Sequence, residues 1–184
     1  APMCDHDGIL INDPMVLKLA EDRFWISIAD SDLLLWCRAV ATERDLDCRV
    51  FEPDVSPLGV QGPRADDTMA DLLGEWVRDV PFFGFVETSH DSIPFVLCRS
   101  GWSGQSGFEL FLQDGSRGLD LWDAVWAAGE KYGIHPGAPT LNERIESDLF
   151  SYRADCGAGA SPLEVGLNRY VSLDRDDDFI GKGA

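Results

Sequence analysis

A chain of 184 residues is long enough to bury a hydrophobic core, and its length fits one domain or two small ones. Hydrophobic residues make up 45% of it, which excludes a disordered protein, and its apolar runs are shorter than the roughly 18 residues that span a membrane, so no membrane partner is expected. The 33 acidic and 15 basic residues give a net charge of −18, which repels polyanions and excludes nucleic acid as a partner.

Two strands, a helix and a third strand are predicted at the N-terminal end. Residues 8–13 and 23–29 are rich in β-branched and aromatic side chains, which is typical of strands. Residues 30–45 show the periodicity of a helix that an Asp or Ser opens as its cap. Residues 48–52 predict the further strand.

A short strand that ends at Gly62 comes next, and Pro63 is expected to start a second helix. Proline suits the first turn of a helix because the N–H that it lacks has no partner there. Asp66 and Asp67 then fall in the first turn, where the helix dipole favours negative charge.

The second half of the chain predicts three strands followed by two helices. The strands are residues 82–87, 93–100 and 107–112. Residues 116–133 predict an amphipathic helix that Gly133 caps, with apolar residues at helical spacing: Leu119, Trp122, Val125 and Trp126. A last helix is expected over residues 138–150.

This order of elements indicates a mixed α/β (α+β) fold. The strands follow one another in hairpin pairs rather than in regular βαβ crossovers, which favours an antiparallel or mixed sheet with helices packed on one face. Residues 153–162 have the composition of a flexible linker. Residues 1–184 are expected to form one domain or two subdomains, about 1–80 and 81–184.

Neither cysteine nor histidine spacing predicts a metal site. The five cysteines form no CxxC pair and their odd number argues against a disulfide framework, so we expect reduced thiols and a cytoplasmic protein. The three histidines are scattered and show no zinc-binding spacing.

The segment GWSGQSG, residues 101–107, lacks the spacing of a phosphate-binding loop and of a serine nucleophile elbow. The remaining candidates are polar residues beside turns. Each taken alone has an ordinary explanation as a turn former, a solvent-facing strand residue or part of a solvated helix face. These residues are Asn12, Asp13, Glu109, Arg144, Glu146 and Tyr152.

Together, five ordered blocks of the chain resemble the glycine-cleavage aminomethyltransferases, or T-proteins. GWSGQSGFELFL resembles the family's Gly-Tyr-Thr-Gly-Glu-x-Gly-Phe-Glu segment. DGILINDP and LGVQGPRA resemble its Gly-Gly-Ile-x-Asp-Asp and Leu-Gln-Gly-Pro-x-Ala segments, and the blocks around ERIES and SPLEVGL…FIGK resemble its downstream motifs. NDP, GWS and ERIES…SY are more similar to the dimethylsulfoniopropionate demethylases and related folate-dependent demethylases.

The resemblance implies a tetrahydrofolate cofactor and the folate-binding aminomethyltransferase fold. The chain would hold the central part of that fold, without its N-terminal segment and its C-terminal β-barrel. Asp13, with Asn12, would be catalytic and lie near the reacting nitrogen. The residues expected to bind the cofactor are Glu109, Trp102, Arg144 and Tyr152.

Glu109 suits the pterin because a carboxylate accepts two parallel N–H bonds from an aminopyrimidine edge. The partner implied is a small methyl or aminomethyl donor, and a homodimer stays open. Methyl transfer to tetrahydrofolate is preferred. The alternatives are the aminomethyltransferase reaction of glycine cleavage and a non-catalytic folate-binding module.

Overall fold

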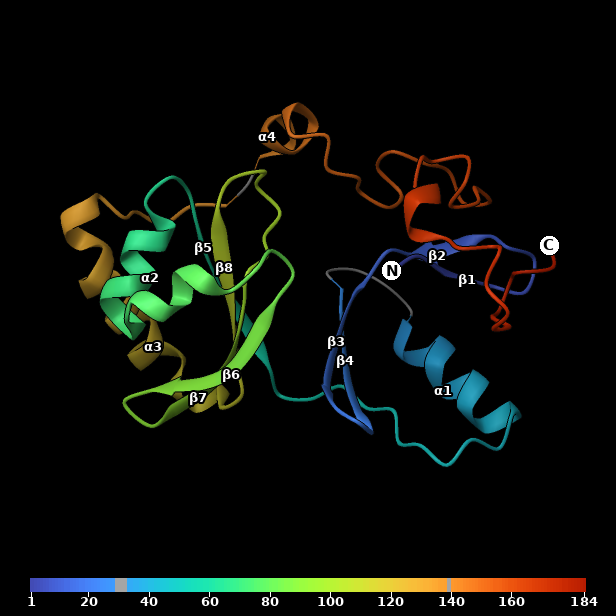
Figure 1. Cartoon of the computed structure of the whole chain (residues 1–184), viewed down its shortest axis with the longest axis horizontal. Coiled ribbons are helices and arrows are strands. Elements are labelled where there is room, and N and C mark those ends of the chain that lie inside the picture. The colour runs from blue at the N-terminus through green and yellow to red at the C-terminus, as the bar shows by residue number, and fades with distance from the viewer. Residues whose placement is uncertain (29–32, 139) are drawn as a thin grey trace. The chain divides into compact units, whose positions relative to one another are not determined.

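The computed structural model describes residues 1–28, 33–138 and 140–184. The chain forms two compact units (Figure 1). Unit 1 comprises residues 1–52 and 151–184, and unit 2 comprises residues 53–150. These bounds differ from the division near residue 80 that the sequence suggested, because the N-terminal and C-terminal segments belong to the same unit.

Unit 2 is built on a four-stranded antiparallel sheet with the strand order β5-β8-β7-β6. The strands are β5 (Ser56–Gln61), β6 (Phe85–His90), β7 (Ile93–Cys98) and β8 (Gly107–Leu112). The prediction of an antiparallel or mixed sheet is therefore confirmed, and the bounds of β8 are those expected from the sequence. The connection by hairpins holds for β6, β7 and β8, whereas β5 pairs with β8 and not with the next strand in the chain.

Helices α2 (Ala65–Leu73) and α3 (Gly118–Gly129) pack together over one face of this sheet (Figure 1). Their apolar side chains join those of the strands in one core, which includes Met69, Leu121, Val125, Val60, Phe95, Leu97, Phe108 and Leu110. Burial of such side chains supplies the main favourable free energy of folding.

The apolar stripe predicted on α3 is only partly correct. Val125 is buried, but Leu119 is 80% exposed and Trp122 is 41% exposed. The buried side of the helix instead follows the four-residue spacing Leu121, Val125 and Gly129. The helix then tightens into η3 (Glu130–Tyr132), and Gly133 ends it in the left-handed conformation, as expected of its C-cap.

The last helix of unit 2, α4 (Leu141–Glu146), is shorter than the range predicted for it. Thr140 begins it with a capping box, in which the Thr140 hydroxyl accepts from the Glu143 N–H and the Glu143 carboxylate accepts from the Thr140 N–H. Pro139 lies outside the described residues. Two further 3-10 turns of unit 2 are η1 (Glu75–Asp79) and η2 (Gly115–Arg117).

The described residues of unit 1 form two antiparallel hairpins and one α-helix. The hairpins are β1 (Met3–Cys4) with β2 (Leu10–Asn12), and β3 (Met15–Ala20) with β4 (Arg23–Ser27). The sequence did not predict β1 or β3. Helix α1 (Leu33–Glu43) follows, and the cap predicted for it at residues 30–32 lies outside the described residues.

One short strand predicted in unit 1 is wrong, because residues 48–52 form no strand. Residues 153–162 are a series of turns, from which the Ala160 carbonyl accepts a hydrogen bond from the Leu10 N–H. The turn η4 (Asn168–Tyr170) completes this unit. Within the described part of the chain, no helix is long and apolar enough to cross a membrane.

Candidate functional site

Strand β8 places Glu109 on the face of the sheet opposite to the helices. Its neighbours Phe108 and Leu110 belong to the core beneath α2 and α3. Side chains alternate along a strand, so Glu109 points to the other face, where it lies between Gly59 of β5 and Cys98 of β7. The strand geometry therefore separates Glu109 from the core beneath the helices.

The Glu109 carboxylate is half-buried and engaged by a serine. The buried Ser100 hydroxyl donates a hydrogen bond to Glu109 Oε2. A carboxylate held in this way is more than a solvent-facing strand residue, which was the ordinary explanation for Glu109. The sequence did not single out Ser100, which lies two residues after the end of β7.

The loop of residues 101–106 connects β7 to β8 beside this carboxylate, and Gln61 lies at its base. Gln61 Nε2 donates to the carbonyl oxygens of Ser100 at 3.0 Å and Phe108 at 3.2 Å. Gln61 Oε1 accepts from the Ser103 hydroxyl at 2.8 Å. Sequence reasoning missed Gln61, although its place before Gly62 at the end of β5 was part of a recognised block.

Trp102 of this loop lies close to Arg144 of α4. The Arg144 guanidinium lies 5.9 Å from the centre of the Trp102 ring, and Arg144 Nη1 donates to the Leu149 carbonyl at 3.1 Å. Arg144 is 5% exposed, so it is no part of a solvated helix face, whereas Trp102 keeps 40% of its surface exposed. Three of the predicted site residues, Glu109, Trp102 and Arg144, thus belong to one end of unit 2.

The other three predicted residues belong to unit 1. Asn12 ends β2 and is buried, and its Oδ1 accepts a hydrogen bond of 2.9 Å from the Asp13 N–H. Asp13 follows in the connection to β3 and is half-buried, and this burial raises the pKa of its carboxyl group above the usual value. Tyr152 lies in a turn, with the Arg153 guanidinium 5.6 Å from its ring centre.

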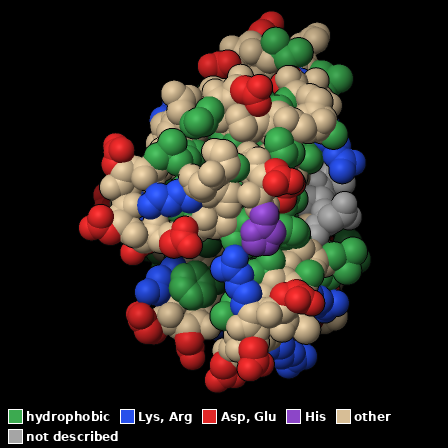
Figure 2. Space-filling view, turned by 90° about the vertical axis from the view of Figure 1, so that its right-hand side faces the viewer, with side chains coloured by type: hydrophobic (Ala, Val, Ile, Leu, Met, Phe, Trp, Pro, Cys, Tyr) green, Lys and Arg blue, Asp and Glu red, His purple; other side chains and the backbone are tan. Residues whose placement is uncertain are grey.

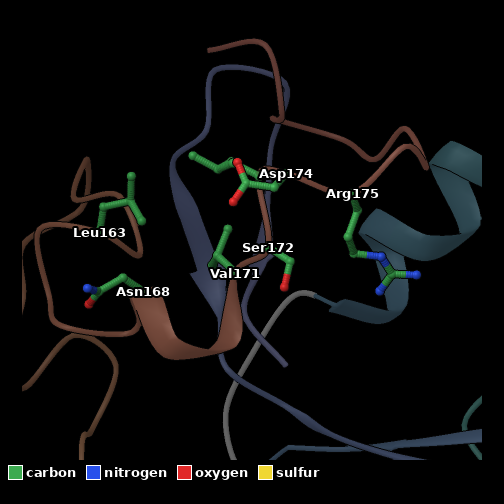
Figure 3. Close-up of a pocket in the computed structure, with 7 residues that line it drawn as sticks. Leu163, Asn168, Val171, Ser172, Asp174 and Arg175 are labelled. Carbon is green, nitrogen blue, oxygen red and sulfur yellow. The ribbon is translucent and has the colours of Figure 1, made fainter.

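A shallow pocket of about 540 Å³ lies in the C-terminal segment of unit 1 (Figure 3). Its lining includes none of the six predicted site residues and consists of Leu163, Asn168, Val171, Ser172, Leu173, Asp174 and Arg175. The Arg175 guanidinium is already paired with the Asp177 carboxylate at 2.6 Å. This pocket therefore adds no support to the predicted site.

The acidic residues do not gather in one place on the face shown in Figure 2, where Asp and Glu alternate with basic and neutral side chains. In residues 1–28, 33–138 and 140–184, no group of three His, Cys, Asp or Glu side chains is placed to hold a metal ion.

Residues 1–175 match the family described as the GCVT N-terminal domain. The chain belongs to this family. The resemblance to the T-proteins is thus confirmed, and the GCVT N-terminal domain accounts for the mixed α/β fold with antiparallel sheets.

Curated relatives carry two different names. The chain is 44% identical over 183 residues to the dimethylsulfoniopropionate demethylase DmdA of Ruegeria pomeroyi, an alignment that covers 100% of the chain and 50% of that protein. It is 31% identical over 191 residues to an aminomethyltransferase of Clostridium botulinum, covering 99% of the chain and 50% of that protein. An aminomethyltransferase of Caldanaerobacter subterraneus is 27% identical with the same coverage. The chain thus spans about half the length of these relatives.

Proposed function

We propose that the full-length protein is a tetrahydrofolate-dependent transferase that moves a methyl group from a small donor, such as dimethylsulfoniopropionate, to the folate. The observation that carries this proposal is the 44% identity to a dimethylsulfoniopropionate demethylase along the whole chain, against 31% to an aminomethyltransferase. The geometry of unit 2 supports the folate part of the proposal.

The residues around Glu109 fit a pterin. The aminopyrimidine edge of a folate presents a ring N–H and an amine side by side, and the Glu109 carboxylate has acceptor positions for both. Each carboxylate oxygen has two lone pairs, so the hydrogen bond from Ser100 to Oε2 still leaves an acceptor position on each oxygen for the pterin. The loop of residues 101–106 carries no charged side chain that would compete for the carboxylate.

Trp102 provides the apolar wall of this site, with Arg144 behind it. A tryptophan with 40% of its surface exposed offers an aromatic face to a flat ring. Arg144 is buried and lies over the Trp102 ring, so it acts on the cofactor by fixing this ring. Tyr152 is proposed as a further cofactor-binding residue on the strength of its motif alone.

Bound tetrahydrofolate would supply a secondary amine nitrogen that bonds to the donor's methyl carbon as the donor's own sulfur–methyl or nitrogen–methyl bond breaks, so that the demethylated donor leaves and the amine loses its proton. Because the cofactor is the nucleophile, the protein's task is to align the two reactants and exclude water. A donor with a positive sulfur or nitrogen also needs a counter-charge, and Asp13 is the half-buried carboxylate proposed to supply it. Asn12 supports this role because its side chain holds the Asp13 N–H and fixes the backbone there.

Aminomethyl transfer is the second candidate function, since several relatives carry the name aminomethyltransferase. A non-catalytic folate-binding module is a candidate from another class. The three candidates differ in whether a one-carbon group is transferred and in whether that group is a methyl or an aminomethyl group.

Mass spectrometry of the folate products separates the three candidates. The full-length protein is incubated with tetrahydrofolate and, in turn, with dimethylsulfoniopropionate, a methylated amine or a protein-bound aminomethyl group. We expect methyl-tetrahydrofolate with a methyl donor and none when protein or donor is left out. Methylene-tetrahydrofolate from the aminomethyl group alone would establish the second candidate. Folate that binds but is recovered unchanged from every mixture would establish the binding module.

A further inference from the structure

We infer that Gln61 is the positioning residue of the folate site, because its side chain sets the conformation of the loop of residues 101–106. This inference rests on the proposed function for its consequence in folate binding, but the effect on the loop itself stands on the contacts of Gln61 alone. Gln61 is the last residue of β5 and pairs in register with Gly107 of β8.

The amide of Gln61 joins both ends and the middle of the loop. Ser100 and Phe108 flank the loop on its two sides, and Nε2 donates to both of their carbonyl oxygens. Ser103 lies within the loop, and its hydroxyl donates to Oε1. A primary amide is suited to this place because it combines two N–H donors with a carbonyl acceptor.

Two glycines of the loop segment leave room for this amide. A Cβ atom at Gly101 or at Gly107 would overlap the Gln61 side-chain amide. Gly104 adopts the left-handed conformation, with φ of 67°, and a Cβ there would overlap Ser147, whose hydroxyl donates to the Ser103 carbonyl at 3.3 Å. The glycines of GWSGQSG are thus explained by close packing around Gln61 and Ser147.

The loop and its flanking residues carry two parts of the proposed folate site, the Ser100 hydroxyl that binds Glu109 and the Trp102 ring. Ser100, which accepts from Gln61 through its carbonyl, donates through its hydroxyl to Glu109. Trp102 lies between Gly101, where a Cβ would overlap the Gln61 amide, and Ser103, whose hydroxyl donates to Gln61 Oε1. A displacement of the Gln61 amide would therefore shift the partner of the Glu109 carboxylate and the aromatic wall together.

Removal of the amide gives the first test. Gln61→Ala removes the hydrogen bonds of the Gln61 amide to the Ser100 and Phe108 carbonyls and to the Ser103 hydroxyl. Gln61→Glu keeps the size of the side chain but places a carboxylate against the two carbonyl oxygens. We expect both variants of the full-length protein to show faster hydrogen exchange in residues 101–106 and roughly ten-fold or weaker tetrahydrofolate binding by calorimetry. Gln113→Ala, which removes a half-buried glutamine beyond the end of β8, is the matched control and should behave as the wild type.

Addition of a methyl group gives the second test. Gly101→Ala in the wild-type background should displace Gln61 and increase exchange in the loop to a similar extent. In the Gln61→Ala background the space is vacated, so Gly101→Ala should add little, and the two effects should be strongly non-additive. Gly137→Ala, at a position with no atoms near the new Cβ, is the control.

The outcomes keep the two proposals apart. Unchanged loop exchange in both Gln61 variants, or additive effects of the Gly101 and Gln61 substitutions, would overturn the role of Gln61 whatever the protein binds. A wild-type protein that does not bind tetrahydrofolate would overturn the proposed function, while the exchange data would still decide the role of Gln61 in the loop. Altered exchange with wild-type folate affinity in the Gln61 variants would overturn its role as a positioning residue of the site.

Discussion

A single carboxylate on β8 is oriented by its neighbours before any ligand is present. Gly59, its partner in the register of β5, has no side chain to shield Glu109, and Ser100 holds one of its oxygens. An acceptor that is already fixed loses less conformational entropy on binding than a free side chain. This explains why an isolated Glu in an uncharged segment suits the recognition of a flat, polar edge.

Glu109→Ala in the full-length protein should weaken tetrahydrofolate binding about a hundred-fold, because two charge-assisted hydrogen bonds are lost. Glu109→Gln should also bind poorly, since its amide turns one acceptor into a donor that faces a donor. The Gln side chain keeps a carbonyl oxygen for Ser100, so the fold of the strand should be retained. Calorimetric titration with tetrahydrofolate measures both variants.

The control for Glu109 is Glu130→Gln, a substitution of an exposed carboxylate in η3. It should bind the folate as the wild type does. Wild-type affinity in Glu109→Ala would show that the carboxylate does not contact the pterin, and the assignment of the site to this face of the sheet would be abandoned.

Asp13 should display opposite effects on stability and activity. Burial raises the pKa of its carboxyl group, so its stabilising contribution is complete below the pKa of the unfolded chain and is lost as the pH rises through the folded pKa. Asp13→Asn stays neutral, and we expect it to unfold at a higher temperature than the wild type at pH 7, with the difference shrinking toward about pH 4. Its turnover should fall roughly ten- to a thousand-fold if Asp13 faces a cationic donor.

Thermal unfolding curves at several pH values, together with initial rates, measure both effects. Asp7→Asn is the control because Asp7 is exposed in the same unit. An Asp13→Asn protein with wild-type turnover would leave Asp13 as a turn residue between β2 and β3.

At the scale of the elements, the sequence predicted strands well where alternation and turn residues coincide. β8 was found at its true bounds because Gly107 starts a run that alternates between the core and the opposite face. β3 was missed because its Met, Leu, Lys and Ala residues favour a helix, and only its pairing with β4 makes it a strand. Tertiary pairing therefore overrode local propensity at this position.

The false strand at residues 48–52 has the reverse explanation. Its Val and Phe residues favour a strand, but its groups make other contacts within unit 1. The Val50 carbonyl accepts from Arg38 Nε of α1 at 3.0 Å, and the Arg49 guanidinium lies 4.7 Å from the centre of the Phe51 ring. A strand requires a partner as well as composition, and composition alone was visible in the sequence.

Candidate site residues were predictable only where a motif marked them. Glu109, Trp102 and Arg144 lie in blocks that resemble family motifs, so the sequence could propose them. Gln61 and Ser100 could not be found in this way, because Gln61 acts through contacts with residues 39 and 47 positions away. Such contacts depend on the order of strands in the sheet, and the hairpin pattern does not reveal that β5 lies beside β8.

At the scale of the whole chain, the division into two units follows the distribution of buried apolar side chains. The large core cluster consists entirely of residues from unit 2, which is one continuous segment. Unit 1 is assembled from both ends of the chain, and its buried hydrophobic residues are fewer, with Leu10, Leu17, Leu33 and Leu167 among them. A continuous segment that has its own core is expected to fold without the rest of the chain.

The segment of residues 53–150 should therefore unfold in a single cooperative transition in urea when it is produced alone, because its sheet, α2 and α3 enclose one core. Phe95→Ala, which empties a fully buried position, should lower its free energy of unfolding by about 3–5 kcal/mol. Leu119→Ala, at a position 80% exposed on α3, should change it by less than about 0.5 kcal/mol. Circular dichroism and tryptophan fluorescence should report the same midpoint. Non-coincident transitions, or equal effects of the two substitutions, would mean that this core is not complete without the segments of unit 1.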